Sequence, residues 1–218
     1  MQTNRSFRIL DLDPEMTAAV ADAAARFGEF DRRTAVVKSL ASDLIPERVG
    51  CVVARLDADG ARAEELLQRI AELGSAHTVL FLADRPATKG IVRVIRLGAV
   101  DVLEWPAERE SLAAAMEHGL EESRARGRRL KEVESARARL AELTGGEREV
   151  LQLLLDGKVN KSIVGRLGIA LRTVEARRKR VFAKMGTRNL ADIAGILSRA
   201  GLLGEFGYPP FVNRSSRN

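Results

Sequence analysis

The sequence predicts an α/β domain with a doubly wound, five-stranded parallel sheet, followed by a smaller all-α domain. In the first half of the 218-residue chain, short apolar runs alternate with helical patterns, and only helical patterns follow. The charge also changes sign along the chain. Residues 1–120 carry 15 Lys and Arg against 19 Asp and Glu, whereas residues 121–218 carry 21 against 11. This asymmetry is typical of a basic module that binds a polyanion, joined to an acidic domain.

Five apolar runs predict the strands of the sheet. They are FRIL (7–10), TAVV (34–37), CVVA (51–54), TVLFLA (78–83) and AVDVL (99–103). Helices are predicted between them at 14–27, 39–47, 61–73 and 87–98. Ligands of such sheets bind beyond the carboxyl ends of the strands. The candidate site of this domain therefore includes Asp11, Arg55, Ala83 and Trp105 with their neighbours.

Changes in the pattern divide the chain into four parts. They are the α/β domain (1–122), a helical linker rich in Arg, Glu and Ala (123–140), the all-α domain (141–203) and a tail without periodicity (204–218). Thr144 and Glu147 have the spacing of a capping box, which predicts that a helix begins just before the apolar run VLQLLL.

Composition argues against several classes of protein. The single cysteine, Cys51, lies inside an apolar run, so a buried thiol is expected and no intrachain disulfide is possible. No uncharged apolar run approaches the roughly 18 residues of a membrane span. We therefore expect a soluble, cytoplasmic protein without a membrane partner. His77 and His118 lie in different predicted elements, and neither a metal nor another cofactor is expected.

A basic helix pair gives the clearest functional prediction. A short helix begins near residue 160, Gly168 allows a tight turn, and a second helix runs over 171–185, which is helix-turn-helix geometry. Residues 158–188 contain ten Lys or Arg and a single acid, Glu175. A basic face kept only for solubility would mix both signs of charge. The one-sided charge therefore favours binding to nucleic acid.

The stretch LTGGEREVLQLLLDGKVNKSIVGRLGIALRTVEARRKRVFAKM resembles the LuxR-type helix-turn-helix of the FixJ/NarL response regulators, and the likeness covers residues 141–203. The resemblance implies a four-helix domain whose third helix enters the major groove of double-stranded DNA. It also implies a homodimer on adjacent half-sites. RNA polymerase and a sensor kinase are left open as further partners.

Position in this motif assigns roles to the candidate DNA-binding residues. Glu175, Ala176 and Lys179 are expected to face the bases, where Glu175 can accept from cytosine and Lys179 can donate to guanine. Phosphates and groove edges are expected at Asn160, Lys161, Arg172, Thr173, Arg177, Arg180 and Lys184. The family usually has Ser where Ala170 stands, so a helix cap worth about 1 kcal/mol is expected to be missing.

The first 120 residues resemble the receiver domain of the same regulators, with local matches in FRILDLD (7–13) and LGAVDVLEWP (97–106). In that family a carboxylate at the end of the third strand accepts a phosphoryl group, and a paired acid on the first strand helps to hold magnesium. A hydroxyl on the fourth strand and a lysine on the fifth bind the phosphate. By position, Arg55 stands at the acceptor, Ala83 at the hydroxyl and Trp105 at the lysine. Asp11 and Asp13 remain near the first strand.

An arginine at the acceptor position, Arg55, indicates a degenerate phosphorylation site. Phosphoryl transfer needs an oxygen nucleophile and a metal, but a guanidinium has only N–H donors, no lone pair and a permanent charge. We expect Arg55 to pair with Asp11 or Asp13 in place of the metal. The alternative is an arginine that extends into solvent without a partner.

The leading interpretation is a sequence-specific DNA-binding transcriptional regulator that works without phosphorylation and is not an enzyme. Three alternatives stay open. They are a conventional response regulator phosphorylated at Asp57, a pseudo-receiver that docks a partner protein or ligand, and a metal-dependent phosphatase site built from Asp11, Asp13, Asp57 and Asp59.

Overall fold

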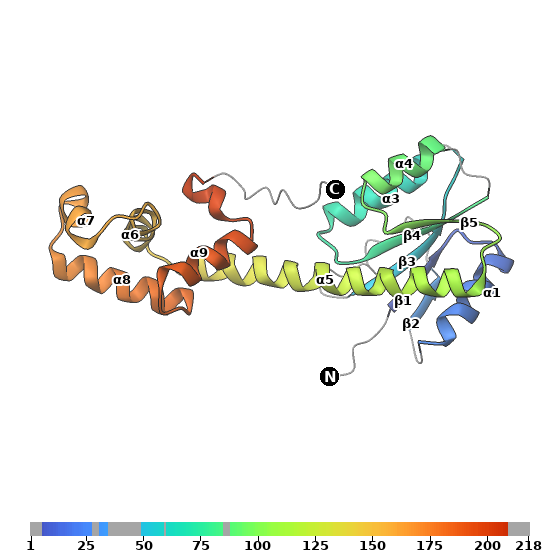
Figure 1. Ribbon diagram of the computed structural model, residues 1–218, viewed down its shortest axis with the longest axis horizontal. Helices are drawn as coiled ribbons and strands as arrows, with labels where there is room; N and C mark the ends of the chain where they lie inside the picture. The colour runs from blue at the N-terminus through green and yellow to red at the C-terminus, as the bar shows by residue number, and fades with distance from the viewer. Residues whose placement is uncertain (1–5, 28–30, 35–48, 59, 85–87, 209–218) are drawn as a thin grey trace. The chain divides into compact units, whose positions relative to one another are not determined.

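The computed structural model describes residues 6–27, 31–34, 49–58, 60–84 and 88–208, and Figure 1 shows its elements. The chain divides into two compact units, Met1–Arg128 and Arg129–Asn218. The boundary falls within one long helix, α5 (Arg109–Ala141), which also contains the predicted linker. None of the helices in the described part of the chain combines the length and the apolar character that a membrane crossing needs.

The first unit is built on a five-stranded parallel sheet in the order β2-β1-β3-β4-β5, which confirms the predicted fold class. The strands are β1 (Ser6–Leu10), β2 (Asp31–Thr34), β3 (Gly50–Arg55), β4 (Thr78–Ala83) and β5 (Asp101–Glu104). The predicted second strand, 34–37, overlaps β2 only at Thr34. Its other residues and the predicted helix at 39–47 lie outside the described residues.

Helices cover both faces of this sheet (Figure 1). They are α1 (Pro14–Ala25), α3 (Ala61–Glu72), α4 (Thr88–Arg96) and the first part of α5. Because side chains alternate along a strand, Val53 faces the core formed with α1 and α5, whereas Val52 faces the core formed with α3 and α4. Both faces of the sheet are therefore covered by mostly apolar side chains.

Helix α5 approaches β3 closely at Gly119. A Cβ atom at this position would lie 2.7 Å from the Sγ of Cys51, which is closer than real contacts allow. The hydroxyl of Thr78 donates a hydrogen bond to the Gly119 carbonyl over 2.8 Å. Cys51 is fully buried, as expected, and burial raises the pKa of its thiol to about 12. The thiol therefore acts as a small apolar side chain at this contact.

The second unit contains the helix-turn-helix that the sequence predicts. Its elements are α6 (Gly145–Leu155), α7 (Asn160–Leu167), α8 (Leu171–Met185), α9 (Leu190–Arg199) and a short 3-10 helix, η2 (Leu203–Phe206). Gly168 makes the turn between α7 and α8 with a left-handed φ of 64°. Buried Ile163 and Val174 join the two helices in one core.

The sequence also made predictions about the caps of two helices in this unit. The capping box of α6 is present: the Glu147 N–H donates to Thr144 Oγ1 over 3.4 Å, and the Thr144 N–H donates to Glu147 Oε2 over 2.9 Å. At the start of α8, Ala170 makes no side-chain cap. Helix α8 therefore begins without the hydrogen bond that a serine would supply.

The beginning of the predicted tail has regular structure. Phe206 in η2 is buried, and its carbonyl accepts a hydrogen bond from the Gln152 side chain of α6 over 3.1 Å. The guanidinium of Arg148 lies over the Phe206 ring, and the Tyr208 hydroxyl donates to Asp156 over 2.6 Å. Residues up to 208 thus belong to the packed unit, and the rest of the tail lies outside the described residues.

Candidate functional site

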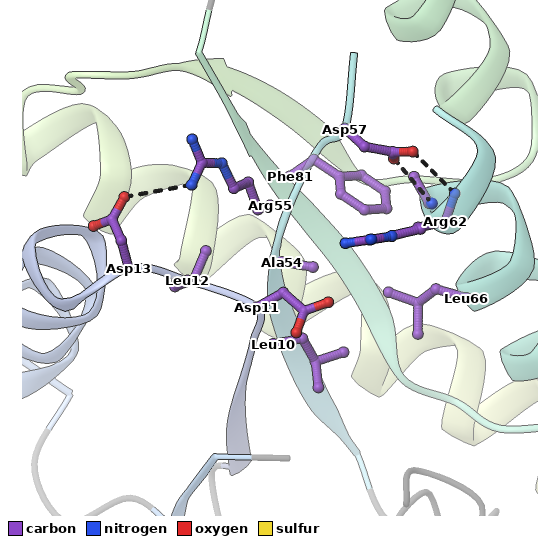
Figure 2. Close-up of a pocket in the computed structure, with 11 residues that line it drawn as sticks. Leu10, Asp11, Leu12, Asp13, Ala54, Arg55, Asp57, Arg62, Leu66 and Phe81 are labelled. Atoms are coloured by element: carbon purple, nitrogen blue, oxygen red, sulfur yellow. Dashed lines mark hydrogen bonds and ion pairs between the residues drawn. The ribbon is translucent and has the colours of Figure 1, made fainter. Parts of the chain in front are cut away.

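A pocket of about 570 Å³ lies at the carboxyl ends of β1 and β3, beside the start of α3 (Figure 2). Parallel strands bring their carboxyl ends to one edge of the sheet, which is where such folds bind ligands. Apolar side chains from the strands and α3 form one part of the lining, and charged side chains form the other. The lining residues are Leu10, Asp11, Leu12, Asp13, Ala54, Arg55, Asp57, Arg62, Ala63, Leu66 and Phe81.

Arg55 ends β3 with its side chain 44% exposed, and it pairs with two carboxylates. Its Nη1 lies 3.7 Å from Asp13 Oδ2, the contact drawn in Figure 2. Its Nη2 contacts Asp84, the residue that follows β4. The expected pair with Asp13 is therefore present, and the expected alternative with Asp11 is not among the ion pairs of the described residues.

Asp57 lies beyond the end of β3, and its carboxylate accepts hydrogen bonds from backbone N–H groups in the first turn of α3. Oδ2 accepts a hydrogen bond from the Arg62 N–H over 3.1 Å, and Oδ1 accepts one from the Ala63 N–H over 3.4 Å. Its backbone carbonyl accepts from the Gly60 N–H over 3.1 Å. Helix starts leave such donors without partners inside the helix, so Asp57 serves as their acceptor.

Helix α8 presents two different faces. Val174, Val181 and Met185 are fully buried. The opposite, exposed face carries Arg172, Glu175, Ala176, Lys179 and Ala183. Among the described residues, the side chains of Arg172, Glu175 and Lys179 take part in no hydrogen bond or ion pair, and the same holds for Lys161 on α7. These groups are available to an external partner, and the small alanines allow it to approach the helix.

The other cations of α8 hold the unit together. Arg177 donates to the Gly146 carbonyl over 3.5 Å. Lys184 donates to the Glu142 carbonyl over 2.8 Å and contacts Glu147 Oε2 at 2.6 Å. Glu147 is only 2% exposed, and its hydrogen bond from Lys184 holds the pKa of its carboxyl below the usual range. These contacts fix α8 against the start of α6.

Two more predicted residues lie at the start of α7 and in the first turn of α8. The Asn160 side chain accepts a hydrogen bond from Arg178 over 3.2 Å, and Thr173 is partly buried. Arg180 Nη1 lies 3.9 Å from Glu147 Oε1, which makes a long ion pair. Arg178, which the sequence analysis did not select, also lies over the Phe182 ring. Most of the predicted set thus divides into exposed side chains without a partner among the described residues and side chains that contact other parts of this unit.

Known proteins show what this arrangement belongs to. Residues 141–197 match the family model described as bacterial regulatory proteins, luxR family. The C4-dicarboxylate transport transcriptional regulatory protein DctR of Rhodobacter capsulatus is 38% identical over 154 residues, which cover 66% of this chain and 75% of DctR. The transcriptional regulatory protein FixJ of Bradyrhizobium diazoefficiens is 31% identical over 156 residues, covering 72% of this chain and 76% of FixJ. The chain belongs to the FixJ family of response regulators.

The response regulator StyR supports the same assignment from its solved structure. It is 26% identical, has a TM-score of 0.70, and the match covers 90% of this chain and 99% of StyR. The present chain is therefore a DNA-binding regulator of transcription with a LuxR-type helix-turn-helix. Its relatives are transcriptional regulators and not enzymes.

In this response regulator the predicted phosphorylation positions come together only in part. Asp11, Asp13 and Arg55 line the pocket, but Ala83 and Trp105 do not. Ala83 is buried in the sheet and accepts a hydrogen bond from the Trp105 N–H over 2.9 Å. Trp105 packs against the core on the α1 and α5 side. Neither position offers the hydroxyl or ammonium group that receivers of the family use.

The pocket residues do not fit the magnesium ion of a receiver. The Arg55 guanidinium already contacts Asp13, and a fixed cation at that place repels a metal. The oxygens of Asp57 are engaged by α3. In the described ranges no three His, Cys, Asp or Glu side chains are grouped to hold a metal. Asp59, a member of the alternative phosphatase site, lies outside those ranges.

The sequence analysis missed Asp84. Asp84 immediately follows Ala83, the last residue of β4, whose register partner on β5 is Glu104. The register of β3 and β4 places Arg55 opposite Leu82. An acid two residues beyond Leu82 was therefore within reach of the Arg55 side chain, and this strand register is the signal that could have identified it.

Proposed function

We propose that this response regulator controls transcription by sequence-specific DNA binding without phosphorylation of its N-terminal unit. The observation that carries the proposal is Arg55 at the end of β3, in contact with Asp13 and Asp84. Phosphoryl transfer to a side chain requires a nucleophile with a lone pair, which a guanidinium lacks. The group that ends β3 therefore cannot form the acyl phosphate that an aspartate forms in a receiver.

Asp57 is a poor substitute for a missing acceptor. Its carboxylate accepts two N–H groups of α3, so an acyl phosphate there would disturb the start of that helix. The hydroxyl and lysine that recognise a phosphoryl group are replaced by Ala83 and Trp105, which do not line the pocket. These contacts support a structural role for Asp57.

For DNA, we propose that a homodimer inserts one α8 per half-site into the major groove. Glu175, Ala176 and Lys179 would face base edges, while Lys161 and Arg172 would contact phosphates. Arg177, Arg180 and Lys184 would act mainly by holding α8 in place, because they contact Gly146, Glu142 and Glu147.

Phosphodonor labelling tests the first part of the proposal. The full-length protein is incubated with acetyl phosphate and Mg²⁺, and its intact mass and DNA affinity are measured. We expect no added phosphoryl group and no change in affinity. A conventional FixJ-family receiver treated in parallel is the positive control. A phosphoryl adduct on the unaltered protein that disappears in Asp57→Asn would overturn the proposal and establish Asp57 as the acceptor.

Two substitutions on α8 test how DNA is read. Lys179→Ala is expected to cost about 1–3 kcal/mol on the preferred site and to relax the preference at one base position. Arg172→Ala is expected to weaken all sequences similarly and to reduce the salt slope of binding by about one. The measurement is fluorescence anisotropy on a set of sites selected from random DNA. Equal effects of both substitutions on every sequence would contradict base reading by Lys179.

A further inference from the structure

The pocket of the N-terminal unit contains two charged groups that the phosphorylation argument leaves unexplained. Arg55 and Asp13 contact each other, and Asp57 accepts hydrogen bonds from α3. By contrast, within the described residues neither the carboxylate of Asp11 nor the guanidinium of Arg62 has a hydrogen bond or ion pair. Both residues line the pocket.

These two groups approach the pocket from opposite walls. Figure 2 shows Arg62 extending from α3 across the pocket toward β3, while the Asp11 carboxylate points in from the end of β1. Leu10, Ala54, Leu66 and Phe81 also belong to the lining of this pocket. Among the described residues, Arg62 and Asp11 thus bring exposed charged groups without a protein partner to the pocket, whereas these apolar lining residues are buried.

Asp11 is held in an unusual backbone conformation. Its φ of 51° lies in the left-handed region, and among the described residues it is the only non-glycine residue with a positive φ. That region costs a side-chain-bearing residue about 1 kcal/mol, although aspartate tolerates it better than most. Asp11 directly follows β1 and lines the pocket in this conformation.

The charges limit what the pocket can bind. A simple anion is attracted by Arg55 and Arg62 but repelled by the three aspartates of the lining, and a metal cation is attracted by these aspartates but repelled by the two arginines. A ligand that carries both charges satisfies both groups, because a carboxylate forms a strong paired hydrogen bond with a guanidinium and an ammonium group binds a carboxylate. A volume of about 570 Å³ is within the usual range for small-molecule sites.

We propose that this pocket binds a small zwitterion of the amino-acid class, with its carboxylate on Arg62 and its ammonium group on Asp11. The inference rests on the proposed function, in which the N-terminal unit needs an input other than phosphorylation. Binding of such a ligand supplies that input in the same place where other receivers accept a phosphoryl group.

Binding is tested on the full-length protein with L-alanine, L-valine, L-leucine, L-methionine and L-phenylalanine as probes. Isothermal titration and the shift of the thermal transition are the readouts. At least one probe is expected to bind saturably at one site per chain. For that probe, the analogue lacking the ammonium group and the analogue lacking the carboxylate are each expected to bind at least about tenfold more weakly. Absence of binding by all five probes overturns the inference.

Two variants locate the site. Arg62→Gln and Asp11→Asn are each expected to weaken binding at least about tenfold, and asparagine can keep the left-handed conformation of residue 11. Arg69→Gln on the same helix, outside the pocket lining, and Glu15→Gln on α1 are matched controls that should bind as the unaltered protein does. Unchanged binding by the two pocket variants overturns the proposed site.

The outcome is independent of the test of phosphorylation. If the protein binds no probe and also accepts no phosphoryl group, this inference fails while the proposed function stands. If acetyl phosphate labels the unaltered protein, the proposed function fails, and the premise of this inference fails with it.

Discussion

Two charged clusters, one in each unit, differ in their access to water. In the Arg55 cluster (Arg55, Asp13 and Asp84) the side chains are between 36% and 44% exposed. In the Glu147 cluster (Glu147 with its partner Lys184) the carboxylate is 2% exposed and belongs to a capping box. Both clusters consist of acids and bases in contact, but only the second has a charge removed from water.

This difference in exposure predicts that the two clusters contribute differently to the stability of the fold. An exposed ion pair contributes little to stability because water and salt screen it. A buried carboxylate must keep its partners, because the loss of one leaves a polar group without compensation. We therefore expect the Arg55 cluster to be dispensable for folding and the Glu147 cluster to be essential for the DNA-binding unit.

The largest effect is expected at Glu147. Glu147→Ala removes the reciprocal hydrogen bond with Thr144 and the partner of Lys184, so we expect the DNA-binding unit to lose about 3 kcal/mol of unfolding free energy. Calorimetry and urea unfolding of the full-length chain measure this loss. A loss below about 1 kcal/mol would place Glu147 with ordinary exposed pairs and remove the contrast between the clusters.

Close packing is expected to matter more than charge in the N-terminal unit. Gly119→Ala places a methyl group 2.7 Å from the Cys51 sulfur, and we expect a cost of about 1–3 kcal/mol in urea unfolding. Cys51→Ala removes that sulfur, so the double variant should be more stable than the sum of the single effects predicts. Gly165→Ala on α7, where nothing lies within 4 Å, is the control and should be neutral or stabilising. Additive effects of the two substitutions would contradict the contact.

Acid should weaken the Glu147 cluster. Because Lys184 lowers the folded-state pKa of Glu147 below its ordinary 4.5, this carboxylate stabilises the fold above about pH 4.5, and the contribution is lost as the pH falls through the lowered value. The difference in unfolding free energy between the unaltered protein and Glu147→Gln should therefore be constant near neutrality and shrink in acid. A difference independent of pH would mean that the charge of Glu147 does not stabilise the unit.

The smallest effect is expected at Arg55. Arg55→Ala should change the unfolding free energy by less than about 1 kcal/mol, because both of its partners are well exposed. Urea unfolding at low and high salt measures the change, with Arg69→Ala as a control for the loss of an exposed arginine. A larger, salt-insensitive loss would show that Arg55 holds the carboxyl ends of the strands together.

Local signals in the sequence predicted much of this molecule. The capping box at Thr144, the turn at Gly168 and the buried stripe of α8 depend on residues close together in the chain, and all are present. Contacts between distant segments were harder to predict. The pairing of Arg55 with Asp84 depends on the register of β3 and β4, and the pairing of Lys184 with Glu147 depends on how α8 lies against α6.

The exposed face of α8 shows the same limit. The resemblance to the LuxR-type motif placed ten residues in the candidate interface, but sequence alone does not reveal which cations have protein partners. Arg177 and Lys184 contact the start of α6, whereas Arg172 and Lys179 do not. Likewise, a single 3-10 turn is too short to show a period, so the packing of Phe206 was not predictable from residues 204–218.

That last turn has a practical consequence for anyone who wishes to study DNA binding with an excised fragment. The family match ends at residue 197, yet Phe206 packs on α6 and Tyr208 reaches Asp156. A fragment trimmed at the match would leave the apolar side of α6 uncovered and prone to aggregate. A fragment of the DNA-binding unit should therefore end after Tyr208, with any affinity tag placed C-terminal to that residue.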